Sequence, residues 1–414
     1  MECNGKKLGS ILWNGCENML VCWSADGITV REYKDVLLAL LDRARPGLFV
    51  EAVGPDPVLY RSKVATYWTK YLREVCTRIV PGHKGTEELD ASCNSLDRFV
   101  REGTDVLQMG IEVCREMQIP IVASLRMNAA DSYHGQLAWS DFGRQNPHLA
   151  LPGRNCYDLA KVEVFMHWLD IFRELVETYD IDGIELNWRR SPQLISYPLH
   201  NYPVLTRMVS DLRRILDDAA AKKGRSRMLL GARVGPLLEG PFVMEEFSGA
   251  NVPTPTNQSC QDLGLDVRQW VKAGYVDYIC PMLWNECLPG TARIKEFADL
   301  TQNTDTGVYG NVWTLPRWMH KGPEAGPVEP EDTQRLRRYK GDICEALLKI
   351  YDDGADGITT FNWYMLHVPE IMSNHDHIGK RLGVGVKKLL LQIYPLLRDR
   401  ARLETYARSE ELLS

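Results

Sequence analysis

The sequence predicts a (β/α)8 barrel, in which eight parallel strands alternate with helices around a closed core. Three observations predict it. About eight short apolar runs are separated by segments with helical spacing of their apolar residues. The segments before the strands are short, whereas those after the strands are long. The 414 residues, 44% hydrophobic and 25% charged, suffice for one such barrel with insertions.

A doubly wound open sheet is the alternative fold. That fold would normally bring a glycine-rich phosphate turn near the start of the chain, and the sequence contains none there. The first strand is expected at 11–13 or at 19–23, because both runs are apolar. The other strands are expected at 48–52, 119–125, 183–189, 228–234, 276–282, 307–313 and 357–363.

Three helical segments precede strands directly. Apolar residues at helical spacing predict helical stretches over 93–117, 158–179 and 332–352. Gly354 is expected to cap the last of these before the eighth strand begins. The order helix, short junction, strand is therefore repeated along the chain.

Four long segments follow strands, at 128–157, 190–202, 235–264 and 314–331, and each is rich in Pro, Gly, Asn or Ser. Segments of this length in a compact domain are usually lids or walls of a binding site. We expect them to crowd the functional face of a barrel that spans residues 1–383. The tail, 384–414, is basic and amphipathic, and we expect a helical extension packed on the barrel rather than on a membrane.

Composition excludes several classes of function. A net charge of −6 argues against a dedicated nucleic-acid binder, and no run of about eighteen apolar residues predicts a membrane span. Eleven cysteines without a C-x-x-C pair indicate buried, reduced thiols. With no apolar leader visible, we expect a cytoplasmic location. No cofactor is expected, and the His375-Asp376-His377 run is too weak a pattern to predict a metal.

The fourth strand carries the strongest functional signal. Its two faces differ: one is apolar, and the other presents Glu185, Asn187 and Arg189. An acid, an amide and a guanidinium on one face of a buried strand are costly unless they pair or line a polar cavity. The pattern therefore predicts a site. Asp182, about 10 Å further down the strand at ~3.3 Å per residue, is expected to fix the strand entrance.

Four segments carry a resemblance to a known family. Asp-Gly-Ile-Glu-Leu-Asn-Trp at 182–188 resembles the fourth-strand motif of glycoside-hydrolase-like TIM barrels, a largely uncharacterised group. Leu-Arg-Met-Asn at 125–128 and Ala-Asp-Gly-Ile-Thr-Thr-Phe-Asn-Trp-Tyr at 355–364 resemble its third and eighth strands, and Ile-Leu-Trp-Asn at 11–14 is a weaker match to the first. The resemblance covers nearly the whole barrel in order and implies a protein that handles sugars.

Two departures limit what the resemblance implies. The family pattern usually has Asp where this chain has Asn187. Against the strand motif of family 18 chitinases, Arg189 stands where the catalytic Glu would be. The resemblance therefore implies a carbohydrate substrate without implying a chitinase mechanism.

Glycoside cleavage needs one carboxylic acid to protonate the leaving oxygen, and a second carboxylate that attacks the sugar or activates water. Glu185 is the first candidate for the acid/base, and Glu286, beside Trp284 after the sixth strand, is the candidate partner. Glu51, at the end of the second strand, is the alternative partner. Glu185 has a structural alternative as well, a hydrogen bond to Arg126 in an inner layer of the barrel.

The remaining site candidates are polar or aromatic residues near strand ends. Amides and guanidinium groups would hydrogen-bond sugar hydroxyls, and tryptophan faces would stack on pyranose rings, although Trp188 is expected to pack between strand and helix. A non-catalytic carbohydrate-binding barrel, or a lyase or isomerase of the same fold, remains an alternative function. The candidate substrate-binding residues are Arg126, Asn128, His134, Asn187, Arg189, Trp284, Trp313, Asn362 and Trp363.

Overall fold

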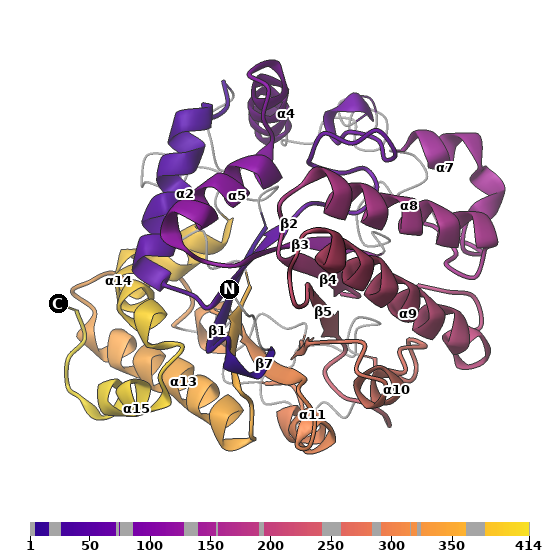
Figure 1. Ribbon diagram of the computed structural model, residues 1–414. Helices are drawn as coiled ribbons and strands as arrows, with labels where there is room; N and C mark the ends of the chain where they lie inside the picture. Colours follow the sequence, from indigo (N-terminus) through magenta and orange to yellow (C-terminus); the bar gives the residue numbers. More distant parts are fainter. Residues whose placement is uncertain are drawn as a thin grey trace.

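The computed structural model is a closed barrel of eight parallel strands in sequential order, with helices around it (Figure 1). This confirms the (β/α)8 fold predicted from the sequence. The structure describes residues 5–15, 26–71, 74, 86–127, 140–154, 156–189, 194–241, 258–283, 291–314, 316–320, 324–361 and 377–413.

The strands lie where the apolar runs predicted them, and β1 uses the first of its two candidate runs. They are β1 Ser10–Asn14, β2 Leu48–Ala52, β3 Ile121–Arg126, β4 Gly183–Asn187, β5 Leu229–Val234, β6 Tyr278–Pro281, β7 Gly307–Val312 and β8 Gly357–Thr360. The barrel closes where β1 pairs with β8.

The main helices lie around the barrel, some of them in a further layer outside the first. They are α2 Val30–Ala44, α4 Thr86–Arg101, α5 Val106–Met117, α7 Asp141–Gln145, α8 Val162–Thr178, α9 Pro198–Lys222, α10 Val267–Lys272, α11 Ile294–Thr301, α12 Arg317–His320, α13 Thr333–Asp352, α14 His377–Ile393 and α15 Arg400–Arg408. Gly354 follows α13 with a φ of 93°, as its predicted capping role requires.

Two expected boundaries are wrong. The stretch 93–117 is two helices, because Gly103 takes a φ of 81° and Asp105 then caps α5 by accepting from the Gln108 backbone N–H. The long segment after β4 is shorter than expected, because α9 begins at Pro198, in the first turn where proline is tolerated.

Two apolar layers separate the inside of the barrel from its outside. Alternate strand residues such as Ile11, Val50 and Tyr278 form an interior cluster. Their neighbours along the strands, such as Phe49 and Ile184, pack outward in a second, larger cluster with the helices. Because side chains alternate along a strand, the position of a polar residue in that alternation decides whether it faces the barrel axis or a helix.

Aspartates fix the amino ends of three strands. Asp182 accepts from the backbone N–H of Ile121 at 2.9 Å and forms an ion pair with Arg115, which confirms its predicted role at the strand entrance. Asp277 and Asp356 bind backbone N–H groups of β5 and β7 in the same way.

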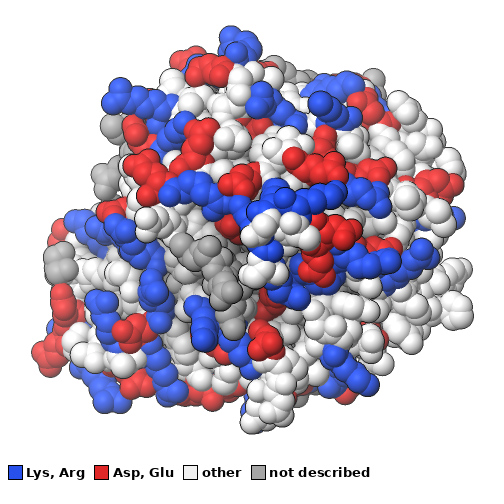
Figure 2. Space-filling model, in the orientation of Figure 1, with Lys and Arg blue, Asp and Glu red and all other residues white. Residues whose placement is uncertain are grey.

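Acidic and basic side chains are interspersed over the face shown in Figure 2.

The C-terminal helices pack on the barrel's helix layer. A kink at Gly383 divides α14, and Val386, Leu389 and Leu390 beyond it are buried. The ammonium group of Lys340 on α13 donates to the backbone oxygen of Ser409 at 2.7 Å, which ties the end of the chain to the barrel. Among the described helices, none combines the length and the apolar character needed to cross a bilayer.

Candidate active site

Glu185 lies inside the barrel, at the middle of β4, with none of its surface exposed. Its Oε1 accepts from Ser124 Oγ at 2.9 Å, and its Oε2 accepts from the Tyr278 hydroxyl at 3.3 Å. The strand register brings these three side chains together. Ser124 on β3 pairs with Glu185, which pairs with Gly231 on β5, and Gly231 pairs in turn with Tyr278 on β6.

Arg233 on β5 is the cation that balances Glu185. Its Nε and Nη2 donate to the two carboxylate oxygens at 3.3 and 3.4 Å, and both side chains have no exposed surface. Nη2 also donates to Thr359 on β8 at 3.2 Å, so this guanidinium spans the barrel interior. Burial lowers the pKa of Arg233, but its charged and hydrogen-bonding neighbours, Glu185 first among them, together outweigh burial, and the net pKa lies above the ordinary value.

Tyr278 reaches Glu185 because β5 has a glycine beside it. A Cβ on Gly231 would lie 2.0 Å from the Tyr278 ring, so only glycine leaves room for the ring. Burial, and then the charge of Glu185, raise the pKa of Tyr278 well above its usual range. Its hydroxyl therefore keeps its proton and stays a donor.

The expected bond from Arg126 to Glu185 is not formed, since the donors to Glu185 are Ser124, Arg233 and Tyr278. Sequence reasoning missed Arg233, although a signal was present. Arg233 is a single guanidinium in the apolar run 228–234, and a lone charge on a buried strand is as costly there as it is at Glu185.

Polar atoms near this ion pair lack partners among the described residues. Arg233 Nη1 has none, and neither does the side-chain amide of Asn311, which is 2% exposed. Asn311 belongs to the inward-facing set of β7, and it pairs in register with Thr359, the residue that Arg233 contacts. Buried donors without partners are costly, so this part of the barrel interior is suited to water or to a polar ligand.

Three of the predicted binding residues, Arg126, Asn187 and Arg189, lie at or just beyond the carboxyl ends of β3 and β4. Arg126 pairs in register with Asn187, which pairs in turn with Arg233 on β5. The Asn187 side chain accepts from the Arg189 backbone N–H at 3.0 Å, which holds the chain as it leaves the strand. Arg189 is 2% exposed, and burial lowers its pKa to about 10.

Aromatic rings fill the interior beside the ion pair. Phe361 stacks on Trp13 with ring centroids 4.5 Å apart, and Trp313 lies 5.0 Å from Phe361. Trp313 is 4% exposed and donates its indole N–H to the Leu283 backbone oxygen at 2.8 Å. Trp188 packs outside the barrel against Trp270, which confirms its predicted position between strand and helix.

Glu51 faces away from the interior. Phe49 on the same strand face belongs to the outer cluster, and a Cβ on Gly110 of α5 would lie 3.5 Å from Glu51 Oε2. Asn14 donates to both carboxylate oxygens at 3.1 Å. Glu51 is therefore a buried acid between β2 and α5, and the alternative that made it the second catalytic carboxylate is wrong.

The other predicted site residues lie outside the described residues. They include the candidate partner acid Glu286, and with it Asn128, His134, Trp284, Asn362 and Trp363. Within the described residues, no group of three or more His, Cys, Asp or Glu side chains is arranged to hold a metal ion.

Comparison with known proteins finds similarity among solved structures. No family model and no curated protein sequence matches the chain. Solved structures that are similar include an α-L-fucosidase from Paenibacillus thiaminolyticus (TM-score 0.46, 12% identity, 97% of this chain and 50% of that one). Another is a chitinase from Ostrinia furnacalis (TM-score 0.44, 10% identity, 97% and 99%). A third is a cycloisomaltooligosaccharide glucanotransferase from Paenibacillus sp. (TM-score 0.39, 9% identity, 74% and 39%).

The chain thus spans half or less of two of these three structures. All three are named as enzymes that act on carbohydrates. At such identities the similarity concerns the barrel fold, which the strand pairing of this chain establishes independently.

Proposed function

We propose that this chain is a glycoside hydrolase, with its site at the carboxyl ends of the barrel strands. The observation that carries the proposal is the polar barrel interior around Glu185. There, Arg233 Nη1 and the Asn311 amide have no partner among the described residues. Sugar hydroxyls can supply both the acceptor for the guanidinium and the donor and acceptor for the amide. Enzymes of this fold carry their chemistry at this end of the barrel.

The environment of Glu185 favours one of the two carboxylate roles. The hydrogen bonds from Arg233, Ser124 and Tyr278 hold the Glu185 carboxylate in a fixed position, as a nucleophile or a base requires. We therefore assign the proton-donor role to Glu286. In this scheme Glu286 protonates the leaving oxygen, while Glu185 attacks the sugar carbon or takes a proton from the attacking water.

A second candidate is a carbohydrate-binding barrel without hydrolysis. The observation that favours it is the complete burial of Glu185 in an ion pair with Arg233, since a paired and covered carboxylate is a structural element as readily as a catalytic one. Arg189, which stands where chitinases carry their catalytic acid, favours the same alternative.

One set of assays separates the two candidates. The purified protein is incubated with aryl glycosides and natural glycans, and the released sugars are quantified beside direct binding measurements. Hydrolysis requires the wild type to release sugar, and Glu185→Gln to lose that activity for every leaving group. Glu286→Gln should retain activity toward aryl glycosides whose leaving group needs no proton. The exposed Glu163→Gln on α8 is the matched control and should keep full activity.

Two results contradict hydrolysis. If the wild type binds glycans and releases no sugar, the binding barrel is the correct function. If Glu185→Gln, folded as judged by near-UV circular dichroism, keeps wild-type turnover, the assignment of Glu185 is wrong.

A further inference from the structure

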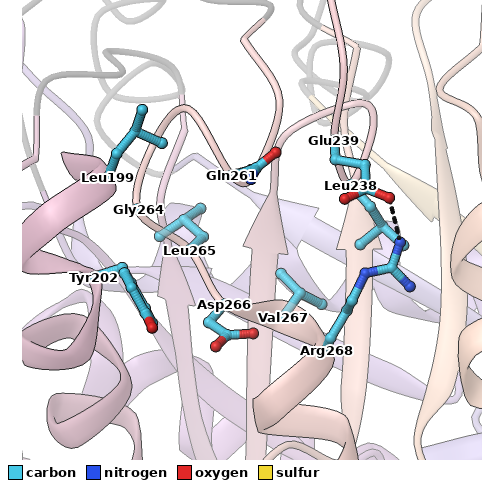
Figure 3. Close-up of a pocket in the computed structure, with 10 residues that line it drawn as sticks. All are labelled: Leu199, Tyr202, Leu238, Glu239, Gln261, Gly264, Leu265, Asp266, Val267 and Arg268. Carbon is cyan, nitrogen blue, oxygen red and sulfur yellow. Dashed lines mark hydrogen bonds and ion pairs between the residues drawn. The ribbon is translucent and has the colours of Figure 1, made fainter.

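A pocket lies outside the barrel wall, between the start of α9 and the segment that joins β5 to α10 (Figure 3). Its volume is about 290 Å³. We call it the Tyr202 pocket, after the aromatic residue that α9 contributes to its lining. This volume is just below that of ordinary ligand pockets, which start at roughly 300 Å³, so the pocket suits one small ring rather than a large molecule.

The inner lining of this pocket is apolar and buried. Leu238, Leu265 and Val267 line it, and their exposed fractions are between 1% and 5%. Tyr202 is 43% exposed and presents its ring from α9. An apolar base beside an accessible aromatic ring suits the C–H face of a pyranose.

Polar groups complete the lining. Glu239 and Arg268 form an exposed ion pair at 3.1 Å, which Figure 3 shows at one side of the pocket. Gln261 also contributes to the lining, and the structure gives its side-chain amide no hydrogen bond to a described residue. A carboxylate, a guanidinium and an amide together offer the donors and acceptors that a ring of hydroxyl groups requires.

The position of the pocket connects it to the candidate active site. Tyr202 is on α9, the helix that follows β4, the strand of Glu185. Leu238 lies five positions after Arg233, in the segment that follows β5. Both segments leave the barrel at the carboxyl ends of their strands, the end at which the proposed chemistry takes place.

We propose that the Tyr202 pocket binds one sugar unit of an extended glycan, at a distance from the unit that enters the barrel. The inference rests on the proposed function and narrows its substrate class to oligosaccharides or polysaccharides. A glycan that fills both places gains affinity from each, whereas a single sugar fills one. The pocket should therefore lower KM for long substrates and leave KM for short substrates unchanged.

The test compares chain length with pocket variants. KM and kcat are measured for an oligosaccharide series, from an aryl monosaccharide upward, with wild type, Tyr202→Ala and Tyr202→Phe. Loss of the ring should raise KM for long substrates roughly tenfold, with kcat and the monosaccharide KM unchanged. Tyr202→Phe keeps the ring and should retain most of the affinity. Met166→Ala on α8, 44% exposed and outside the pocket lining, is the matched control.

Gln261→Ala is a second variant, which removes a hydrogen-bonding group from an exposed position and does not alter the apolar base. Equal KM values for wild type, Tyr202→Ala and Gln261→Ala on every chain length would overturn this inference while leaving hydrolysis standing. A wild type that neither cleaves nor binds any glycan would instead overturn the proposed function itself.

Discussion

Replacing Arg233 by methionine tests the ion pair at the centre of the barrel. The substitution keeps most of the side-chain volume and removes the charge, so Glu185 becomes a carboxylate with no exposed surface and no cation. Breaking a buried pair by removing one partner costs about 3–5 kcal/mol. Glu185 would retain the bonds from Ser124 and Tyr278, which places the expected loss near the lower end, about 3 kcal/mol.

The double variant identifies the cause of that loss. Glu185→Gln alone leaves the Arg233 charge buried without its anion and should also be costly, whereas combining it with Arg233→Met removes both charges. The free energy of unfolding, from urea titrations of all four proteins, should therefore show the double variant to be less destabilised than the two single losses added together. We expect a coupling of about 1–3 kcal/mol. Additive losses, each under about 1 kcal/mol, would refute the claim that these side chains form a buried pair.

Four further outcomes follow from described residues. Gly231→Ala should lower the free energy of unfolding by about 1–3 kcal/mol, and Tm with it, because the added Cβ would overlap the Tyr278 ring. An unchanged Tm would contradict this packing. Asp277→Ala should cost about 3 kcal/mol in urea titrations, because two arginines and a β5 backbone N–H lose their acceptor, and a loss below about 1 kcal/mol would contradict that role. Burial raises the pKa of Cys260 and Cys280 to about 12, so both thiols should resist a thiol reagent at pH 8 until urea is added. Their raised pKa values also predict that stability falls as pH rises from about 9 to about 12, since the unfolded chain releases these protons first.

The sequence predicted the barrel because local patterns determine it. Apolar runs and helical periods can be located in short windows, and the order of the elements then restricts the topology. The error over 93–117 arose where Gly103 and Asp105 interrupt an otherwise regular helical spacing. One residue with positive φ and one capping side chain outweighed the apolar pattern.

The partners of Glu185 were harder to predict, because they depend on register and closure. Tyr278 is two strands away from Glu185, and the two meet only because Gly231 lies between them. The orientation of Glu51 was hard to predict for a related reason. A strand that is buried on both faces, as β2 is, gives no sequence signal of which side chains face the barrel axis.

The most direct test of the central claim is a crystal structure of Glu286→Gln with a bound oligosaccharide. We expect one sugar unit inside the barrel mouth, with a hydroxyl about 3 Å from Arg233 Nη1 or from the Asn311 amide. A barrel interior that stays closed around Glu185, with the glycan bound elsewhere or absent, would contradict it.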